Sequence, residues 1–361
     1  MFQKLNRRVL HPPAFGLDIS DLTVKFARLG RKRAGFTLEH FGEVGIPAGV
    51  IAGGEIKKED DLVALLKDGL STSEGRKVGE RFCIASLPEE KSFVRVIELP
   101  NIKPDDIAHA VRWEVEGAIP MRFDEIYFDY EVMPVWREAA DHRDVLITAF
   151  PKTIVNSYYA AISRAGLRPI ALELESQAIL RAIIARELYN TPALAVDMGA
   201  TRTSFIIFAG GSLIFTKTIS IGGRDFEAAI ASSLNVSPEE ARQIKIEYGL
   251  SKSYLDGRVF GALSLHVETI TAELQQQLWF YLDHSAKRHK SFPDIERVFL
   301  CGGDANLIGL EKYVSTAIKK PVAAANPFIN FRWPPGSIPP IPRNGSLKYA
   351  TAIGLALREY E

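Results

Sequence analysis

Hydrophobic residues along the chain follow two alternating patterns, which together predict a mixed α/β protein. Short runs rich in β-branched and aromatic residues are typical of strands, and longer stretches with helical periodicity separate them. The predicted strands cover residues 15–19, 24–29, 36–44, 82–85, 92–98, 145–150, 193–197, 203–208, 213–219 and 298–301. The predicted helices cover residues 57–70, 104–117, 152–165, 173–189, 224–234, 237–248, 263–290, 306–319 and 346–358. This alternation favours sheets covered by helices.

One predicted helix has a well-defined start. Ser237 is a preferred capping residue, Pro238 suits the first helical position, and the carboxylates of Glu239 and Glu240 would lie near the positive end of the helix dipole. We therefore expect this helix to begin at or just after Ser237.

Two segments far apart in the chain repeat the same pattern. Residues 15–28 read FGLDISDLTVKFAR, and residues 194–208 read LAVDMGATRTSFIIF. Each contains an apolar strand, an aspartate, a short turn and a second apolar strand, with Asp18 and Asp197 in matching positions. A single hairpin of this kind would be a weak signal, because Asp commonly lies at turns. Two in the same register predict a duplicated lobe.

Length and composition describe a soluble globular protein with more than one lobe. The chain has 361 residues, and its 44 Lys plus Arg balance 44 Asp plus Glu, so no overall field attracts nucleic acid. Cys83 and Cys301 lie in apolar runs and are expected to be free buried thiols. The seven histidines show no paired ligand spacing, which argues against a metal-dependent hydrolase. No run reaches the roughly 18 uncharged residues of a membrane helix.

The repeated hairpins have the composition of a phosphate-binding turn. Phosphates need backbone N–H groups that they can approach closely, and the Mg²⁺ that accompanies them needs a carboxylate. In the second hairpin Asp197 supplies the carboxylate, Gly199 and Ala200 permit close approach, and Thr201 offers a hydroxyl group. The first hairpin continues from Asp18 through Ser20 and Asp21 without a glycine, so that its fit to phosphate is poorer.

Two further motifs follow along the chain. The run CGGDANLIGL at residues 301–310 joins a buried strand to a helix, where a nucleoside could lie against the backbone of Gly302 and Gly303. The run SPEEARQIKIEYG at residues 237–249 presents Lys245 near its end, in reach of a ribose or base. Taken singly, the first motif is more often a simple turn and the second a solvated surface charge.

The order of these four motifs resembles that of the superfamily of actin, Hsp70, MreB and FtsA. The resemblance implies an α/β, actin-like fold with two duplicated ribonuclease-H-like lobes and ATP in the cleft between them. Long stretches from residue 15 to 359 also resemble the PilM family of type IV pilus assembly proteins, most strongly at residues 92–221. The first of them, residues 92–133, is similar to the family's small inserted α+β subdomain.

The resemblance implies a division into three parts. The first lobe would comprise residues 1–89, 168–189 and 345–361, the inserted subdomain residues 90–167, and the second lobe residues 190–344 with its own helical insertion around 224–295.

Site residues carry over from the superfamily motifs position by position. Asp18 and Asp197 would hold Mg²⁺ through water, and the residues that would bind ATP are Asp18, Ser20, Asp197, Gly199, Ala200, Thr201, Lys245, Gly302 and Gly303. Glu175 is the candidate for orienting a water molecule, with a plain helix-start carboxylate as the equal alternative. Ser20, Asp21 and Asp304 depart from the usual pattern, so that weak ATPase activity at most is expected.

Family membership also implies a place in the cell and a partner. The chain would be a cytoplasmic, nucleotide-binding scaffold of the platform that assembles pili at the inner membrane, with ATP as a conformational clamp. It would bind the N-terminal cytoplasmic tail of PilN beside the inserted subdomain, and other platform proteins, while self-association stays open. Aromatic and apolar residues of the region that could line this groove are Trp113, Ile119, Phe123, Tyr127 and Phe128.

Three other classes of protein remain as alternatives. These are a GspL-like component of type II secretion, an FtsA-like division filament and a small-molecule kinase of the actin superfamily. A kinase would need an acceptor pocket with a catalytic base, for which the sequence offers no clear motif.

Overall fold

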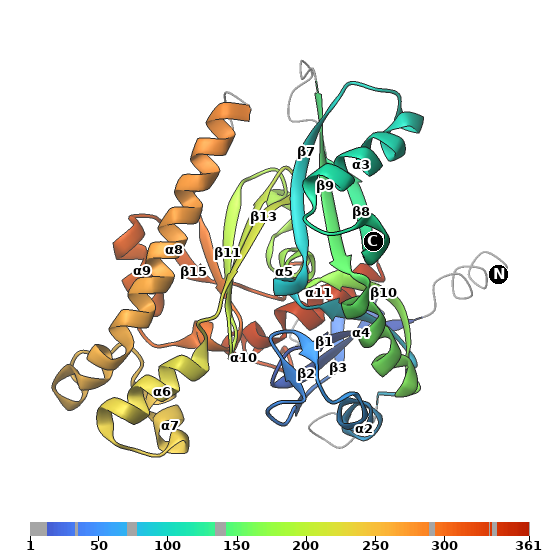
Figure 1. Cartoon of the computed structure of the whole chain (residues 1–361). Coiled ribbons are helices and arrows are strands. Elements are labelled where there is room, and N and C mark those ends of the chain that lie inside the picture. Colours follow the sequence, from blue (N-terminus) through green and yellow to red (C-terminus); the bar gives the residue numbers. More distant parts are fainter. Residues whose placement is uncertain are drawn as a thin grey trace. The chain divides into compact units, whose positions relative to one another are not determined.

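The computed structural model describes residues 13–32, 35–70, 78–133, 142–288, 293–331, 333 and 338–360 (Figure 1). Its chain divides into two compact units. The first comprises Met1–Arg186, Pro327–Ile341 and Tyr349–Glu361, and the second comprises Glu187–Asn326 and Pro342–Lys348. Each unit has a five-stranded sheet at its centre.

The sheet of the first unit has the strand order β10-β6-β1-β2-β3. Its strands are β1 (Ala14–Ile19), β2 (Thr23–Lys32), β3 (Gly35–Gly45), β6 (Phe82–Leu87) and β10 (Arg168–Leu174). The first three form an antiparallel meander, whereas β6 and β10 add on the other side of β1 as parallel strands. All six residues of β1 are buried, as a central strand with covered faces requires.

The sheet of the second unit repeats this topology strand for strand. It has the order β13-β12-β11-β14-β15, with strands β11 (Ala193–Met198), β12 (Thr203–Ala209), β13 (Ser212–Ile219), β14 (Val298–Cys301) and β15 (Val322–Ala324). Again three strands form an antiparallel meander, and two parallel strands follow on the other side of the first. Asp18 and Asp197 are each the last residue but one of the central strand. The predicted duplication of the lobe is therefore confirmed.

Helices cover the first sheet through unusually close backbone contacts. They are α2 (Glu59–Gly69), α4 (Lys152–Arg164), α5 (Glu175–Ile183) and α11 (Ala350–Arg358). A Cβ atom on Gly16 of β1 would lie 2.0 Å from the Ala352 carbonyl oxygen of α11, and one on Gly354 would lie 1.7 Å from the Ala178 carbonyl oxygen of α5. These glycines let α11 lie directly against both the strand and the neighbouring helix.

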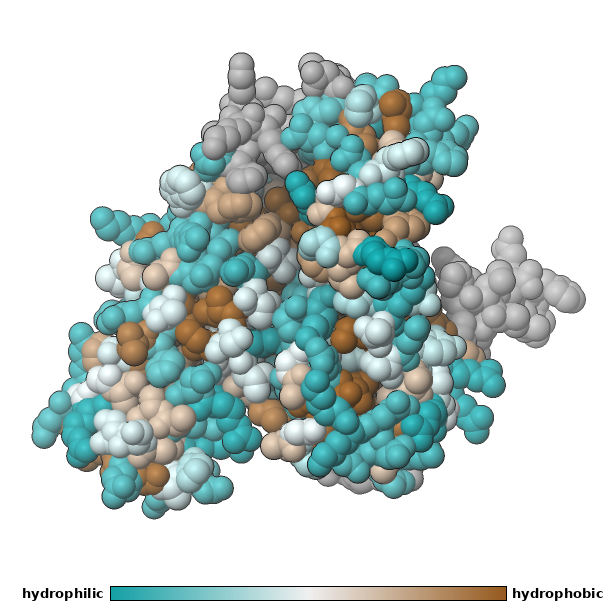
Figure 2. All heavy atoms as spheres, in the orientation of Figure 1, coloured by the Kyte–Doolittle hydropathy of each residue, from teal (hydrophilic) through white to brown (hydrophobic). Residues whose placement is uncertain are grey.

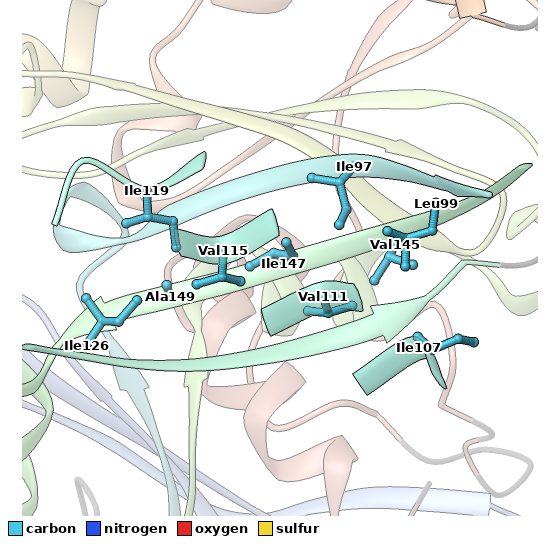
Figure 3. Packing of buried hydrophobic residues seen from close by; sticks show 10 residues of the cluster. All are labelled: Ile97, Leu99, Ile107, Val111, Val115, Ile119, Ile126, Val145, Ile147 and Ala149. Atoms are coloured by element: carbon cyan, nitrogen blue, oxygen red, sulfur yellow. The ribbon is translucent and has the colours of Figure 1, made fainter. Parts of the chain in front are cut away.

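The first unit also contains the predicted α+β insertion. Its three-stranded antiparallel sheet has the order β7-β9-β8, formed by β7 (Phe93–Pro100), β9 (His142–Pro151) and β8 (Ile126–Val132). Helix α3 (Pro104–Ala118) covers one face, and Figure 3 shows the apolar side chains between them. The cluster combines alternating strand positions with helix positions four apart: Ile97, Leu99, Ile107, Val111, Val115, Ile119, Ile126, Val145, Ile147 and Ala149.

The second unit is covered by α6 (Gly223–Leu234), α7 (Pro238–Tyr248), α8 (Arg258–Arg288), α9 (Leu310–Ile318) and α10 (Arg343–Ser346). Helix α7 starts as predicted: Ser237 Oγ accepts a hydrogen bond from the Glu240 amide at 3.2 Å, and the Glu240 carboxylate accepts one from the Ser237 amide. Within the described residues no helix is both long enough and apolar enough to cross a membrane. Cys83 and Cys301 are free and buried, which confirms their prediction.

Short elements complete the chain. They are the hairpin of β4 (Ile51–Ala52) and β5 (Glu55–Ile56), and the 3₁₀ turns η1 (Glu89–Lys91), η2 (Phe123–Glu125), η3 (Arg186–Leu188), η4 (Tyr254–Gly257), η5 (Gly303–Asn306) and η6 (Leu347–Tyr349).

Several predicted boundaries were wrong for identifiable reasons. The helix predicted at residues 306–319 begins only at Leu310, because Gly309 has φ +84° and interrupts the helical geometry after η5. The helix predicted at 173–189 begins at Glu175, because the preceding residues pair with β6 as strand β10. Helix α8 starts earlier than its predicted residue 263, and residues 289 and 290 of that prediction lie outside the described chain.

Periodicity also failed to find the two-residue strands β4 and β5 and three longer strands. Strand β15 has only three residues, too few to show a period. Strand β10 contains Pro169, which an edge strand tolerates although the pattern argues against it. The third, β8, mixes acidic and aromatic residues and was expected from the family resemblance alone.

The close approach of α11 to α5 makes a specific stability prediction. Gly354→Ala would place a methyl group where the Ala178 carbonyl lies, so we expect the free energy of unfolding to fall by about 1–3 kcal/mol. Gly117→Ala on the exposed side of α3 is the matched control, since no atom lies within 4 Å of the added methyl group. We expect it to be neutral or stabilising by up to about 1 kcal/mol. Urea unfolding of both variants measures this, and equal midpoints would contradict it.

Candidate nucleotide-binding turns

The first aspartate is held inside the hairpin of β1 and β2. Asp18 is buried, and its Oδ1 accepts a hydrogen bond from Ser86 Oγ of β6 at 3.0 Å. Lys25, its register partner on β2, places its ammonium 4.0 Å from Asp18 Oδ2. An aspartate at the carboxyl end of a central strand therefore has a hydroxyl group and a cation beside it. Lys25 is a candidate that sequence reasoning missed, although its place on the strand opposite Asp18 could have indicated it.

The two residues that depart from the family pattern shape the first turn. Ser20 Oγ donates to the Thr23 carbonyl at 3.0 Å, so its hydroxyl closes the hairpin. Both carboxylate oxygens of Asp21 accept hydrogen bonds from the β4–β5 turn, from the amides of Gly53 at 3.1 Å and Gly54 at 3.0 Å. The negative charge of Asp21 is therefore held by two backbone donors. These hydrogen bonds stabilise the carboxylate and reduce the repulsion that its charge would exert on a phosphate nearby.

The second turn is built against the start of helix α6. The Gly199 amide donates to the Arg202 carbonyl at 2.9 Å, which closes the turn, and Ala200 is exposed at its tip. The carbonyls of Gly199 and Ala200 accept hydrogen bonds from the amides of Gly223 and Arg224 at 3.0 Å and 2.9 Å. Thr201, half-buried, completes the turn.

Gly222, the residue before α6, allows the second turn to lie this close to the start of the helix. A Cβ atom on Gly222 would lie 2.6 Å from the Ala200 carbonyl carbon, so only glycine fits there. The second turn thus has a fixed backbone with little freedom to rearrange.

Asp197 lies beside the third predicted motif. Gly302, the residue after β14, has φ +89°, and a Cβ atom there would lie 2.4 Å from the Met198 carbonyl oxygen and 2.6 Å from Asp197 Oδ1. In contrast, a Cβ atom on Gly303 would meet nothing closer than Lys348 Cβ at 3.7 Å. Gly302 is therefore required by the protein itself, whereas a methyl group at residue 303 would make only an ordinary van der Waals contact. The fold brings Asp197 and the glycine turn together as the sequence predicted.

Cys301 is the neighbour of Asp197 on the parallel strand β14. Burial raises the pKa of the Cys301 thiol well above its usual value, and the Asp197 charge adds to the shift. The raised pKa favours the protonated thiol at neutral pH. It occupies the place that Ser86 takes beside Asp18 in the first unit.

Lys245 is the centre of a buried charge cluster rather than a solvated charge. Its ammonium lies 2.6 Å from Asp304 Oδ1 and 2.8 Å from Glu227 Oε1, and it donates to the Gly223 carbonyl at 3.3 Å. The Asp304 carboxylate also fills the space in front of Gly223, where a Cβ atom would come within 2.1 Å of its Oδ2. Burial raises the pKa of Asp304, and Lys245 opposes that shift. The cluster connects α6, α7 and η5.

Glu175 is the first residue of α5, where both of its alternative roles remain open. It is buried, and the next residue, Ser176, donates its amide and its hydroxyl group to the Glu89 carboxylate at 3.0 Å and 2.9 Å. Glu89 follows β6, so it ties the end of that strand to the helix. Strand β6 also separates β1, which carries Asp18, from β10, which leads to Glu175.

The five groove candidates of the inserted subdomain fall into different environments. Ile119 belongs to the buried cluster, and Phe123 and Phe128 pack against it. Trp113 is 77% exposed on the outer side of α3, and Tyr127 is 48% exposed on the sheet face opposite α3. On the face that Figure 2 shows, apolar residues are interspersed with hydrophilic ones.

Comparison with known proteins identifies the family. The family model described as type IV pilus assembly protein PilM matches residues 16–360. The chain belongs to the PilM family.

Solved structures show the fold to which PilM-family chains belong. The PilM-PilN type IV pilus biogenesis complex matches with a TM-score of 0.80 and 23% identity, covering 97% of this chain and 99% of that chain. EutJ from Carboxydothermus hydrogenoformans matches with a TM-score of 0.55 and 14% identity, over 98% and 97% of the two chains. MreB5 of Spiroplasma citri bound to AMPPNP matches with a TM-score of 0.55 and 12% identity, covering 96% of this chain and 95% of that chain. The predicted actin-like fold is confirmed.

Curated relatives of this PilM-family chain include cell division protein FtsA. FtsA of Bacillus subtilis is 27% identical over 196 residues, which is 54% of this chain and 40% of that protein. FtsA of Enterococcus hirae is 25% identical over 224 residues, 62% and 45% of the two chains. The chain thus spans less than half the length of these relatives.

The charge cluster of this PilM-family chain predicts a large effect of removing its cation. Lys245→Met leaves the half-buried Asp304 and Glu227 carboxylates without their ammonium, so we expect a loss in the free energy of unfolding that is below the roughly 3–5 kcal/mol of a fully buried pair. Lys312→Met, at an exposed position of α9, is the matched control and should change little. The double variant Lys245→Met/Asp304→Asn should recover part of the loss. Chemical denaturation tests this, and equal stability of the two single variants would refute the cluster's role.

Proposed function

We propose that this chain is a nucleotide-binding scaffold in type IV pilus assembly, and not a metabolic enzyme. The observation that carries the proposal is the repetition of one sheet topology in both units, with an aspartate at the same position of each central strand. In a family of pilus assembly proteins, two such acidic turns would bind a nucleotide that controls the conformation of the protein.

The turns of the second unit fit the requirements of Mg-ATP. Half-buried Asp197 offers a carboxylate for Mg²⁺ through water, as hard cations with oxygen ligands prefer. The turn of Gly199, Ala200 and Thr201 would receive phosphates, and the backbone of Gly302 and Gly303 would lie against the nucleoside. When bound, Mg²⁺ would supply charge neutralisation to the phosphates. The solved MreB5 structures of the same fold contain AMPPNP or ADP, which supports this assignment.

The turn of the first unit would serve the same ligand. Asp18 would contribute a second carboxylate for Mg²⁺ through water, with Ser20 shaping the turn, and the nearby Lys25 ammonium would attract a phosphate. The chain's own residues would thus hold nucleotide from both repeats. We infer that the nucleotide acts as a clamp, because a ligand that touches both units favours the arrangement in which it makes the most contacts.

Turnover is proposed to be slow at most. Glu175 would orient the attacking water if hydrolysis occurs, from its buried position at the start of α5. Lys245, assigned to the nucleoside, is already bound by Asp304 and Glu227, so that nucleoside contacts must compete with two carboxylates. This competition would lower the affinity for the nucleotide, which is consistent with a ligand that is turned over slowly.

The partner is proposed to be the N-terminal cytoplasmic tail of PilN, bound along β8. This strand is an edge of the inserted sheet, and an extended peptide can add to a free edge. Its face opposite α3 presents Tyr127, Asp129 and Glu131, an aromatic anchor and two carboxylates. Cytoplasmic tails of membrane proteins are rich in basic residues, which complements this charge. The likeness to the solved PilM-PilN complex supports the choice of partner.

Binding of a tail would also determine where the protein works. A chain recruited by the cytoplasmic tail of a membrane protein would lie at the cytoplasmic side of the inner membrane, peripheral to it and next to the other platform proteins. Figure 1 marks β8 in the subdomain to which we assign the tail.

Calorimetry with Mg-ATP tests the nucleotide site. We expect saturable binding to the wild type and its loss in Asp197→Ala, because that variant removes the carboxylate for Mg²⁺. Asp294→Ala, an exposed carboxylate of the same unit, is the control and should bind like the wild type.

Two glycine variants separate loss of ligand from loss of fold. Gly303→Ala should keep the stability of the wild type while weakening Mg-ATP, whereas Gly302→Ala should lower stability as well, since its methyl group collides with Asp197 and Met198. Binding of Mg-ATP by Asp197→Ala at wild-type affinity would disprove the assigned site.

Fluorescence anisotropy with a labelled PilN tail peptide tests the partner site and the clamp. We expect Tyr127→Ala to weaken binding roughly tenfold or more, as loss of an aromatic anchor commonly does. Trp113→Ala, an exposed aromatic residue on the other side of the same subdomain, should bind like the wild type. If Trp113→Ala weakened binding and Tyr127→Ala did not, the peptide would instead bind on α3. Affinities that are equal with and without Mg-ATP would remove the clamp.

A further inference from the structure

The inserted subdomain brings Glu98 of β7 together with two metal-ligating side chains of β9 that are more than 40 residues away in the sequence. His142 and Asp144 are two residues apart on β9, so they point to the same face of the sheet. Glu98 on β7 is the register partner of Asp144. Their neighbours Ile97, Leu99 and Val145 belong to the cluster under α3, so the three polar side chains lie on the opposite face.

The ligand atoms of these side chains converge. One atom from each residue can be chosen so that all three lie within 4.8 Å of one another. His142 Nε2 lies 3.8 Å from Asp144 Oδ1, and both atoms are shielded from water. Glu98 is exposed. Atoms bound to one tetrahedral ion lie roughly 3–4 Å apart at bond lengths of about 2.0–2.2 Å. The three ligand atoms approach this spacing.

The donor set of this face suits a divalent cation. Glu98 and Asp144 are register partners on neighbouring strands, so an ion between them would have carboxylate ligands from both strands. A neutral imidazole as third donor selects the class of metal, because nitrogen ligands suit Zn²⁺ and similar transition ions whereas Mg²⁺ and Ca²⁺ prefer oxygen.

We propose that Glu98, His142 and Asp144 form a binding site for a divalent transition ion of the Zn²⁺ type. Three protein ligands leave a fourth position to water. The ion ties the edge strand β7 to the central strand β9 at the end of β7 that leads into α3. It therefore stabilises the subdomain, independently of the nucleotide turns and of the proposed tail site on β8.

Titration of the chelator-treated full-length chain with Zn²⁺ by calorimetry tests the site. We expect one saturable site in the wild type, binding at least tenfold weaker in His142→Ala and Asp144→Asn, and a thermal midpoint that rises by a few degrees with the ion only where the site is intact. His109→Ala on the exposed side of α3 is the control and should bind like the wild type. With Co²⁺ as a probe, the visible absorption of a bound ion should appear in the wild type and be lost in His142→Ala.

Glu98→Gln keeps the test decisive if a β9 variant fails to fold, because Glu98 is exposed and its replacement leaves the core intact. It too should weaken Zn²⁺ at least tenfold. The proposal is overturned if the wild type shows no saturable binding, if Glu98→Gln and His142→Ala bind like the control, or if Mg²⁺ binds as tightly as Zn²⁺.

Discussion

Both units depend on a close approach between the end of the central strand and the end of its parallel neighbour. In the second unit the chain after β14 passes so near Met198 and Asp197 that residue 302 can only be glycine. In the first unit the corresponding neighbour, β6, brings the Ser86 hydroxyl group onto Asp18. Hydrogen bonding between parallel strands brings these strand ends together. As a result, each sheet carries one carboxylate at the carboxyl end of its central strand.

The buried charge cluster connects three segments that the chain keeps far apart. Glu227 comes from α6, Lys245 from α7 and Asp304 from η5, and each contributes to one network. Such a network is costly to bury unless every charge finds a partner, so these segments are held in a definite arrangement. A ligand that draws on Lys245 would act on all three at once. The cluster therefore joins two helices of the second unit to η5 through one ammonium group.

The inserted subdomain has a hydrophobic core of its own. Its cluster is formed almost wholly by α3 and the three strands of its own sheet, so its shape does not rely on the large sheet of the first unit. One face is closed by α3, and the other presents an aromatic residue, carboxylates and a histidine. A self-contained core with a polar face can bind partners or ions without disturbing the nucleotide turns.

The sequence by itself predicted a mixed α/β chain, because strand and helix periods and the turn in each hairpin depend on residues close together in the chain. The repeated hairpins around Asp18 and Asp197 predicted the duplication, and the resemblance in motif order predicted the actin-like fold. The same motifs made Asp197 and the glycine pair site candidates. Tertiary structure alone decided the partners of Lys245 and Asp21 and the convergence of Glu98 on His142 and Asp144. These contacts join segments that are distant in the sequence. Their geometry follows from strand register and helix packing, which cannot be read from the spacing of residues along the chain.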